Sequence, residues 1–273
     1  MIVFPSCKIN LGLHILSKRD DGFHTIETIF YPVHALSDVL EIIPNSQKNN
    51  TFQQKGIEIG QQTGLNLVEK AYCLLQQNFN LPFVDMFLYK NIPVGAGLGG
   101  GSSDASFALK LLNNLFDLRL SNEKLITYAG LLGSDCPFFI ENIPAFGKAK
   151  GEELSTCLIP QLSGKYIIIV KPNISISTPE AYRNCIPIQR NDSLEKIISQ
   201  PLSTWKDALK NDFETTLFPI YPELKEIKEA IYQQGAIYAS LSGSGSALFG
   251  IFPEEPLSIN FENDYFVFQG RLE

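Results

Sequence analysis

The sequence predicts an α+β fold, because apolar strands come first and helices mixed with strands follow. Residues 2–16 alternate between apolar and polar side chains, as half-buried strands do. Residues 165–170, Lys-Tyr-Ile-Ile-Ile-Val, form an apolar run typical of a strand that is buried on both faces. A parallel α/β sheet would instead need a regular alternation of strands and helices. We therefore expect α+β.

The expected elements of the first section are strands at 2–16, 25–33, 38–43 and 84–90. The polar stretch 45–64 predicts an irregular loop with a weak strand. Residues 66–79 place apolar side chains on one face of a helix, and residues 105–116 do the same. Ser121 is an expected N-cap for a further helix that runs to 132.

The second section is expected to begin near Gly164 with the strand 165–170. Helices are predicted at 178–184, 194–199, 202–210 and 222–234, and Gly235 marks the end of the last one. Strands at 236–241 and 247–252 flank the small residues Ser242–Ser246. The pattern after Phe252 is weak.

Composition narrows the possible functions. The chain has 273 residues, with 44% hydrophobic and 19% charged, which is enough for a core in one large or two modest domains. A net charge of −7 argues against a general binder of nucleic acid or anionic membranes. The five cysteines and three histidines lack the spacing of a disulfide framework or zinc site. We expect a cytoplasmic protein, without a membrane span, that is a monomer or weak homodimer.

Residues 93–104 are the most informative stretch. Five glycines fall within positions 95–101, between an expected strand and an expected helix. Such a loop exposes backbone N–H groups at a helix N-terminus, where anions are favoured. An ordinary turn needs only one or two glycines, and more would cost conformational entropy. We interpret the loop as a cradle for a nucleotide triphosphate.

Two common phosphate loops do not fit this stretch. Gly95, Gly97 and Gly100 match G-x-G-x-x-G, but the acidic residue that a dinucleotide fold places about 20 residues further on is missing. The loop ends in Gly-Ser-Ser, whereas a Walker loop ends in Gly-Lys-Ser/Thr.

Several polar residues could carry chemistry. Asp135, just before Pro137, could act as a base, although such an aspartate is often only a turn or cap residue. Lys8 lies in an apolar strand, on the same face as Asn10. It could stabilise the charge of a transferring phosphoryl group, or it could be an edge-strand lysine that prevents aggregation.

Phe23 and His24 could hold a flat heterocycle or belong to the core. Ser242–Ser246 is either a hairpin turn or a second phosphate contact.

In combination these segments resemble the GHMP small-molecule kinase superfamily. The likeness extends from Pro5 to Phe252. The motifs that carry it are Pro93-x3-Gly97-Leu98-Gly99-Gly100-Gly101-Ser102-Ser103, Pro5-x-x-Lys8-Ile9-Asn10-Leu11, Arg19-x-x-Gly22-Phe23-His24-Thr25, Gly133–Phe139 and Ser242–Gly245. The motifs that begin at Pro5 and Arg19 narrow the resemblance to the members that act on a methylerythritol linked to cytidine diphosphate. Those members usually have tyrosine at the position of Phe23.

The resemblance implies a kinase that transfers phosphate from ATP, with Mg²⁺, to the 2-hydroxyl of a methylerythritol linked to cytidine diphosphate. It makes Lys8 and Asp135 the catalytic pair. The residues expected at ATP are Pro93, Val94, Gly95, Ala96, Gly97, Leu98, Gly99, Gly100, Gly101, Ser102 and Ser103, with Asn66 and Lys90 nearer the adenosine. The residues expected at the acceptor substrate are Asn10, Phe23, His24, Tyr182 and Gly243.

The fold implied is a two-domain GHMP-kinase-like one. Residues 1–162 would form an N-terminal ATP-binding domain like the second domain of ribosomal protein S5, and residues 163–273 a ferredoxin-like C-terminal domain that completes the substrate cleft. Because the chain has no evident acidic cluster, Mg²⁺ would be held by ATP phosphates, water and a hydroxyl such as that of Ser103. Alternatives are a homoserine, mevalonate or sugar kinase, or a non-catalytic nucleotide-binding regulator.

Overall fold

The computed structural model describes residues 1–57, 64–183, 185–188, 190, 192–257, 261 and 264–273. The chain forms two compact units that are interleaved along the sequence. The first unit comprises Met1–Cys7, Leu36–Val94 and Gly99–Ile143, and the second comprises Lys8–Ala35, Gly95–Leu98 and Pro144–Glu273. Within the stretch 93–104, residues 95–98 thus belong to the second unit and the residues on either side of them to the first. The domain boundary after residue 162 stays a prediction.

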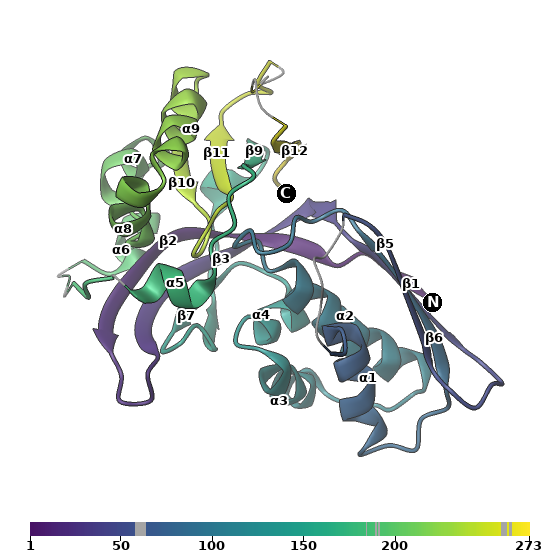
Figure 1. Cartoon of the computed structure of the whole chain (residues 1–273). Coiled ribbons are helices and arrows are strands. Elements are labelled where there is room, and N and C mark those ends of the chain that lie inside the picture. The colour runs from purple at the N-terminus through teal and green to yellow at the C-terminus, as the bar shows by residue number, and fades with distance from the viewer. Residues whose placement is uncertain (58–63, 184, 189, 191, 258–260, 262–263) are drawn as a thin grey trace. The chain divides into compact units, whose positions relative to one another are not determined.

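The first unit is a sheet with helices packed on one side of it (Figure 1). The strand order is β1-β4-β6-β5, and only β5 and β6 pair in parallel. The strands are β1 (Ile2–Val3), β4 (Val39–Pro44), β5 (Thr51–Gly56) and β6 (Val84–Lys90). The helices are α1 (Leu67–Gln76), α2 (Gly100–Leu115), α3 (Asn122–Leu132) and α4 (Cys136–Glu141). The weak strand expected within 45–64 is β5, and residues 58–63 of that stretch lie outside the described residues.

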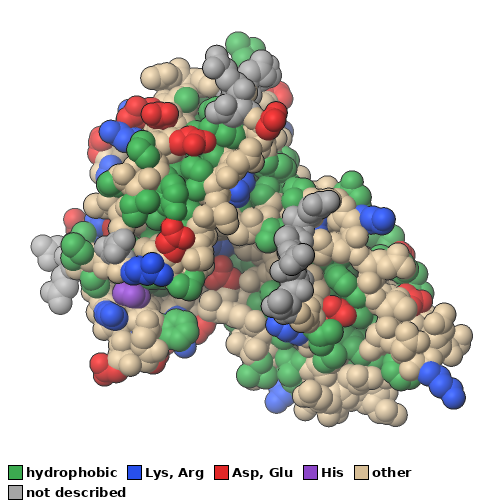
Figure 2. Space-filling model, in the orientation of Figure 1, with side chains coloured by type: hydrophobic (Ala, Val, Ile, Leu, Met, Phe, Trp, Pro, Cys, Tyr) green, Lys and Arg blue, Asp and Glu red, His purple; other side chains and the backbone are tan. Residues whose placement is uncertain are grey.

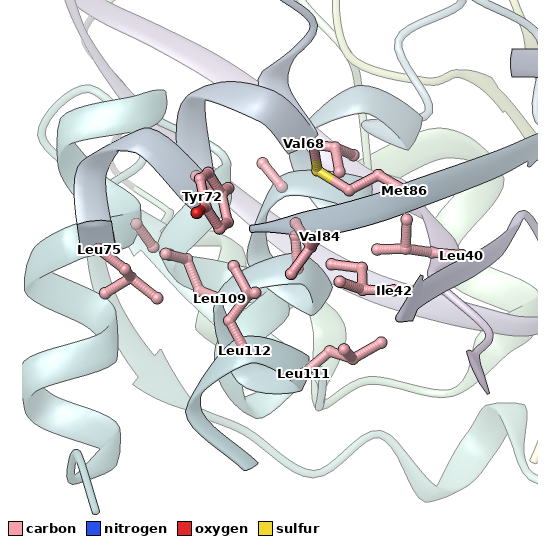
Figure 3. Packing of buried hydrophobic residues seen from close by; sticks show 14 of the residues in the cluster. Leu40, Ile42, Val68, Tyr72, Leu75, Val84, Met86, Leu109, Leu111 and Leu112 are labelled. Atoms are coloured by element: carbon pink, nitrogen blue, oxygen red, sulfur yellow. The ribbon is translucent and has the colours of Figure 1, made fainter. Parts of the chain in front are cut away.

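Alternation along β4 and β6 builds the core of this unit. Leu40 and Ile42 of β4, with Val84, Met86 and Leu88 of β6, are buried and face the helices, whereas the residues between them are partly exposed. Figure 3 shows Leu40, Ile42, Val84 and Met86 together with side chains from the helices, which are Val68, Tyr72, Leu75, Leu109, Leu111 and Leu112. Asn66 caps α1 and Ser121 caps α3, so both predicted helix starts are confirmed.

The second unit contains two antiparallel sheets. One has the order β2-β3-β7-β8 and the other β10-β11-β9-β12. The strands are β2 (Ser6–Lys18), β3 (His24–Ser37), β7 (Ala145–Lys148), β8 (Glu153–Thr156), β9 (Tyr166–Lys171), β10 (Tyr238–Leu241), β11 (Leu248–Phe252) and β12 (Phe266–Arg271). The first two residues of β2 and the last two of β3 belong to the first unit. Ile167–Val170 of β9 are fully buried, as the apolar run predicts.

The helices of the second unit confirm most predictions there. They are α5 (Thr178–Arg183), α6 (Leu194–Ile198), α7 (Trp205–Ala208), α8 (Phe213–Ile220) and α9 (Pro222–Gln233). The single helix expected at 202–210 is wrong: a 3-10 turn, Leu202–Thr204, precedes a short α7. Residue 184, the expected end of α5, lies outside the described residues. Gly235 follows α9 with φ +96°, which suits glycine at a helix end.

The surface carries no broad field of one sign on the face that Figure 2 shows, as far as the described residues go. Acidic and basic side chains are interspersed there with hydrophobic ones. Within the described part of the chain, no helix combines the length and the apolarity that crossing a membrane requires.

Candidate active site

The glycine loop has the backbone conformation that its composition predicts. Gly95, Gly97 and Gly99 have φ values of +62°, +75° and +72°, a region that other residues rarely adopt. Gly99 is the N-cap of α2, and no side chain among the described residues caps that helix. Gly101 in its first turn is exposed. The first N–H groups of α2 are therefore open to an anion.

The second glycine segment packs directly against the first, within the second unit. The Ser242 hydroxyl donates to the Gly97 carbonyl at 3.0 Å, and the Ala247 N–H donates to the Ala96 carbonyl at 3.1 Å. A Cβ on Gly97 would lie 2.0 Å from the Ser242 carbonyl oxygen. Ser242–Ser246 is thus a partner of the phosphate loop as well as a connection between β10 and β11.

Lys8 and Asn10 point to the same side of β2, as the two-residue period predicts. The Lys8 ammonium donates to Asn10 Oδ1 at 2.6 Å and lies 5.1 Å from the centre of the Phe30 ring. A Cβ on Gly243 would lie 3.2 Å from the same Asn10 oxygen. Lys8 is 3% exposed, so it is not a surface lysine guarding a sheet edge.

His24 and Tyr182, both expected at the substrate, lie together. Their rings stack with centroids 4.7 Å apart and planes 16° apart, and Tyr182 also contacts the edge of Phe213. Burial beside these rings lowers the pKa of His24, so the imidazole is neutral at pH 7. Phe23 is 58% exposed, and its ring lies 5.0 Å from the Lys150 ammonium. A flat exposed ring remains available for stacking.

Asp135 precedes α4 in the first unit and is partly buried. Its side chain makes no capping hydrogen bond to that helix, so it is not a capping aspartate. The Ser106 hydroxyl on α2 donates to the Cys136 carbonyl at 2.7 Å, which ties the start of α4 to the helix that follows the glycine loop.

Lys90 and Asn66 have structural partners. Asn66 and Glu69 form a capping box at the start of α1. The Lys90 ammonium is buried, is hydrogen-bonded to Asp38 and lies 2.6 Å from Asp104. An ammonium held by two carboxylates would have to leave them to bind a nucleotide. A contact of either residue with adenosine stays a prediction.

Burial changes the protonation of this cluster. Asp38 also accepts hydrogen bonds from the N–H groups of Asn91 and Ile92. Asp104 Oδ1 is buried without a hydrogen-bond partner among the described residues. Desolvation raises the pKa of Asp104 to about 8. Burial acts against the charge of Lys90, but the interactions of its ammonium with Asp104 and Asp38 outweigh burial and raise the pKa of Lys90. With a pKa of about 8, the Asp104 carboxyl is mostly protonated at pH 7.

Replacing Asp104 by asparagine should change how stability depends on pH. Folded Asp104 keeps its proton up to about pH 8, whereas the unfolded chain loses it near the ordinary value of 3.8. Between these values the folded state binds more protons, so wild-type stability falls as pH rises. Asp104→Asn lacks this loss, so its stability relative to wild type should rise by up to ~1.4 kcal/mol per pH unit and level off above about pH 8.

Urea unfolding at several pH values measures this difference. Asp117→Asn is a matched control, because Asp117 is 74% exposed and only pairs with Arg119 at the surface. Parallel pH profiles for wild type and Asp104→Asn would mean that Asp104 is ionised in the folded protein.

Sequence reasoning missed a polar segment at the start of α8. Asn211 donates to the carbonyls of Leu241 and Gly243 at 2.8 and 2.9 Å, which are the bonds that hold the second glycine segment in place. Glu214 accepts from the Leu241 N–H at 2.9 Å and from Lys228 at 2.6 Å. The signal in the sequence was Asn-Asp-Phe-Glu at 211–214, where polar residues surround an aromatic one.

Comparisons with known proteins agree with this geometry. The model of the GHMP kinases N terminal domain matches residues 66–142, and that of the GHMP kinases C terminal matches residues 193–263. The chain therefore belongs to the GHMP kinase family, and it is a kinase that uses ATP.

The most similar relatives indicate which kind of GHMP kinase this chain resembles. A protein of Bacteroides fragilis named 4-diphosphocytidyl-2-C-methyl-D-erythritol kinase is 50% identical over the full length of both chains. A Cytophaga hutchinsonii protein of the same name is 48% identical over 94% of each chain. A crystal structure of 4-(cytidine 5'-diphospho)-2C-methyl-D-erythritol kinase has a TM-score of 0.80 and 31% identity, over 93% of this chain and 91% of that one.

More distant structures share the fold alone. The Methanococcus jannaschii mevalonate kinase has a TM-score of 0.73 at 15% identity, and covers 100% of this chain and 98% of its own. The predicted two-domain GHMP-kinase-like α+β fold is thus confirmed.

Proposed function

We propose that this kinase transfers the γ-phosphoryl group of ATP to the 2-hydroxyl of 4-diphosphocytidyl-2-C-methyl-D-erythritol, giving the 2-phosphate and ADP, in the non-mevalonate synthesis of isoprenoid precursors. The observation that carries the proposal is the Gly97–Ser242 contact beside Lys8, Asn10 and Gly243. A backbone cradle and a buried ammonium are there combined within one unit. Full-length relatives with that name support the choice of acceptor.

In this proposal the chain contributes alignment and charge. The glycine loop and the first turn of α2 bind the ATP phosphates through backbone N–H groups. Lys8 offsets charge on the transferring group, and Asp135 accepts the proton of the attacking hydroxyl. His24, Tyr182 and Phe23 bind the cytosine, where a neutral imidazole can both donate and accept hydrogen bonds. Cytoplasmic location and a monomeric or weakly dimeric state belong to the same proposal.

The side chains of the described residues fit a metal that is held mainly by its substrate. They contain no group of three or more His, Cys, Asp or Glu residues that could hold a metal ion. The Ser103 hydroxyl, in the first turn of α2, is buried and has no hydrogen-bond partner among the described residues. Mg²⁺ bound to ATP would neutralise phosphate charge, and Ser103 is the residue that we propose as its protein ligand.

Ser103→Ala should therefore raise the Mg²⁺ concentration needed for half-maximal turnover. The hydroxyl is lost, but no hydrogen bond between described residues is broken, so the fold should hold. Ser199→Ala, at an exposed serine outside the glycine loop, is the control. An unchanged Mg²⁺ titration of Ser103→Ala would remove Ser103 from the metal site.

Release of ADP with three acceptors tests the function itself. The cytidyl substrate, homoserine and mevalonate are offered side by side at equal concentrations. We expect turnover of the cytidyl substrate, because Phe23, His24 and Tyr182 supply rings that the other two acceptors do not need. Turnover of homoserine or mevalonate alone would overturn the proposal, and no turnover of any acceptor would favour a nucleotide-binding regulator.

A further inference from the structure

We infer that Thr28 is a positioning residue, which orients the Asn10 amide and thereby holds the Lys8 ammonium in place for phosphoryl transfer. The inference rests on the proposed role of Lys8. The four residues concerned, Lys8, Asn10, Gly12 and Thr28, all belong to the second unit. The side chains of Lys8, Asn10 and Thr28 are 3%, 1% and 0% exposed, so water does not compete for their hydrogen bonds.

These residues form a chain of hydrogen bonds with one direction. Lys8 Nζ donates to Asn10 Oδ1 at 2.6 Å, Asn10 Nδ2 donates to Thr28 Oγ1 at 2.9 Å, and Thr28 Oγ1 donates to the Gly12 carbonyl at 2.7 Å. The second and third links have ordinary hydrogen-bond lengths, and the first, from a charged donor, is slightly shorter. This series of hydrogen bonds begins at the Lys8 ammonium, which only donates, and ends at the Gly12 carbonyl, which only accepts.

This direction determines which way the amide faces. The Gly12 carbonyl takes the single proton of the Thr28 hydroxyl, which leaves only lone pairs on the Thr28 oxygen for Asn10. Asn10 must then turn its NH₂ group to Thr28 and its oxygen to Lys8. Without the hydroxyl, the amide could turn its NH₂ group to the ammonium, and two donors would face each other.

The Gly12 end of this hydrogen-bond series is closely packed. Gly12 has φ +73°, a conformation that favours glycine, and a Cβ there would lie 2.7 Å from Leu209 Cδ1. Thr28 lies opposite Gly147 in the pairing of β3 with β7, so its backbone is fixed on that side as well. Because Gly12 is closely packed and Thr28 lies in a paired strand, one hydroxyl can transmit a defined orientation to Asn10.

The Lys8 ammonium is therefore held in one position by its neighbours. Asn10 Oδ1 holds the ammonium from one direction, and the Phe30 ring lies 5.1 Å away. A misplacement of about 1 Å at a catalytic group can slow an enzyme by about 100-fold. Thr28 does not need to touch the substrate for its loss to be felt in turnover.

The test is a set of steady-state measurements on the full chain with ATP and the cytidyl substrate. Thr28→Val keeps the shape and removes the hydroxyl, and should lower kcat about 10- to 100-fold while KM for ATP stays within about twofold. Thr28→Ser keeps the hydroxyl and should retain most of kcat. Thr204→Val is the matched control, because it removes another hydroxyl-to-carbonyl bond, of 2.8 Å to Pro201, at an exposed site.

A double-mutant cycle separates positioning from a merely structural effect. If Thr28 acts through Asn10, Thr28→Val should have almost no further effect on kcat in an Asn10→Ala background. Equal effects in both backgrounds, a wild-type kcat for Thr28→Val, or a kcat for Thr28→Ser as low as that of Thr28→Val would each overturn the inference.

Lys8→Met tells failure of this inference from failure of the proposed function. We expect this variant to lose turnover. If Lys8→Met is inactive while Thr28→Val is fully active, only the positioning role of Thr28 is overturned. Wild-type turnover by Lys8→Met would overturn the role of Lys8 and the inference that depends on it. Unfolding midpoints of all variants establish that folded proteins are compared.

Discussion

Asp135→Asn should fold, bind ATP and lose most of its turnover. Asparagine has nearly the same shape as aspartate but cannot accept the proton of the attacking hydroxyl at neutral pH. General-base contributions of this kind are worth about 10²- to 10⁴-fold in rate. The Asp135 carboxylate makes no capping hydrogen bond to α4, so the substitution removes no side-chain cap from that helix.

Steady-state kinetics with ATP and the cytidyl substrate measure this effect, together with direct ATP binding. We expect kcat to fall while the affinity for ATP changes little, since the lost interaction is one that matters in the transition state. Glu141→Gln is the matched control, because Glu141 is an exposed acid at the other end of α4. A near-normal kcat for Asp135→Asn would place the base elsewhere or mean that proton removal does not limit the rate.

The fold was predictable wherever a local pattern was long enough. The strand Val84–Lys90 has the bounds expected from its alternation, and α3 starts after Ser121 as its capping chemistry predicts. The missed elements are short or irregular. Helix α4 has only six residues, and α8 contains Pro219, which argues against a helix. Strand β12 is defined by its pairing with β9, about which its own sequence says little.

In the candidate site, too, the features set by a local pattern were predictable and those set by distant residues were not. A two-residue period was enough to place Lys8 and Asn10 on one face of β2. The partners of Lys90 could not be predicted, because Asp38 and Asp104 are 52 and 14 positions away in the sequence. The residue against which Gly97 packs, Ser242, is 145 positions away in the sequence, so the need for glycine at position 97 could not be predicted locally. The stacking of His24 on Tyr182 likewise joins two distant segments, for which only the family resemblance gave a hint.

Gly97 shows how one position can serve both backbone conformation and contact between segments. Its φ of +75° is unfavourable for alanine, and a Cβ would also lie 2.0 Å from the Ser242 oxygen and 3.2 Å from the Gly245 nitrogen. These are backbone atoms, which cannot move aside as the end of a side chain can. Gly97→Ala must therefore separate the two glycine segments and weaken the hydrogen bonds from Ser242 and Ala247.

Gly95→Ala isolates the first of these two effects. Gly95 has φ +62° in the same loop, but a Cβ there would meet nothing within 4 Å. Gly95→Ala should lower the free energy of unfolding by ~1–2 kcal/mol through backbone strain. Gly97→Ala should lower it by a further ~1–3 kcal/mol, because overpacking adds to the same strain.

Chemical denaturation of the two variants and wild type measures the difference, and ATP binding is measured alongside. Because the loop that we propose to bind phosphate is braced by Ser242, Gly97→Ala should also weaken ATP binding. Equal destabilisation by Gly95→Ala and Gly97→Ala would mean that the second glycine segment yields without cost. That result would reduce its role from a support of the phosphate loop to a simple turn between β10 and β11.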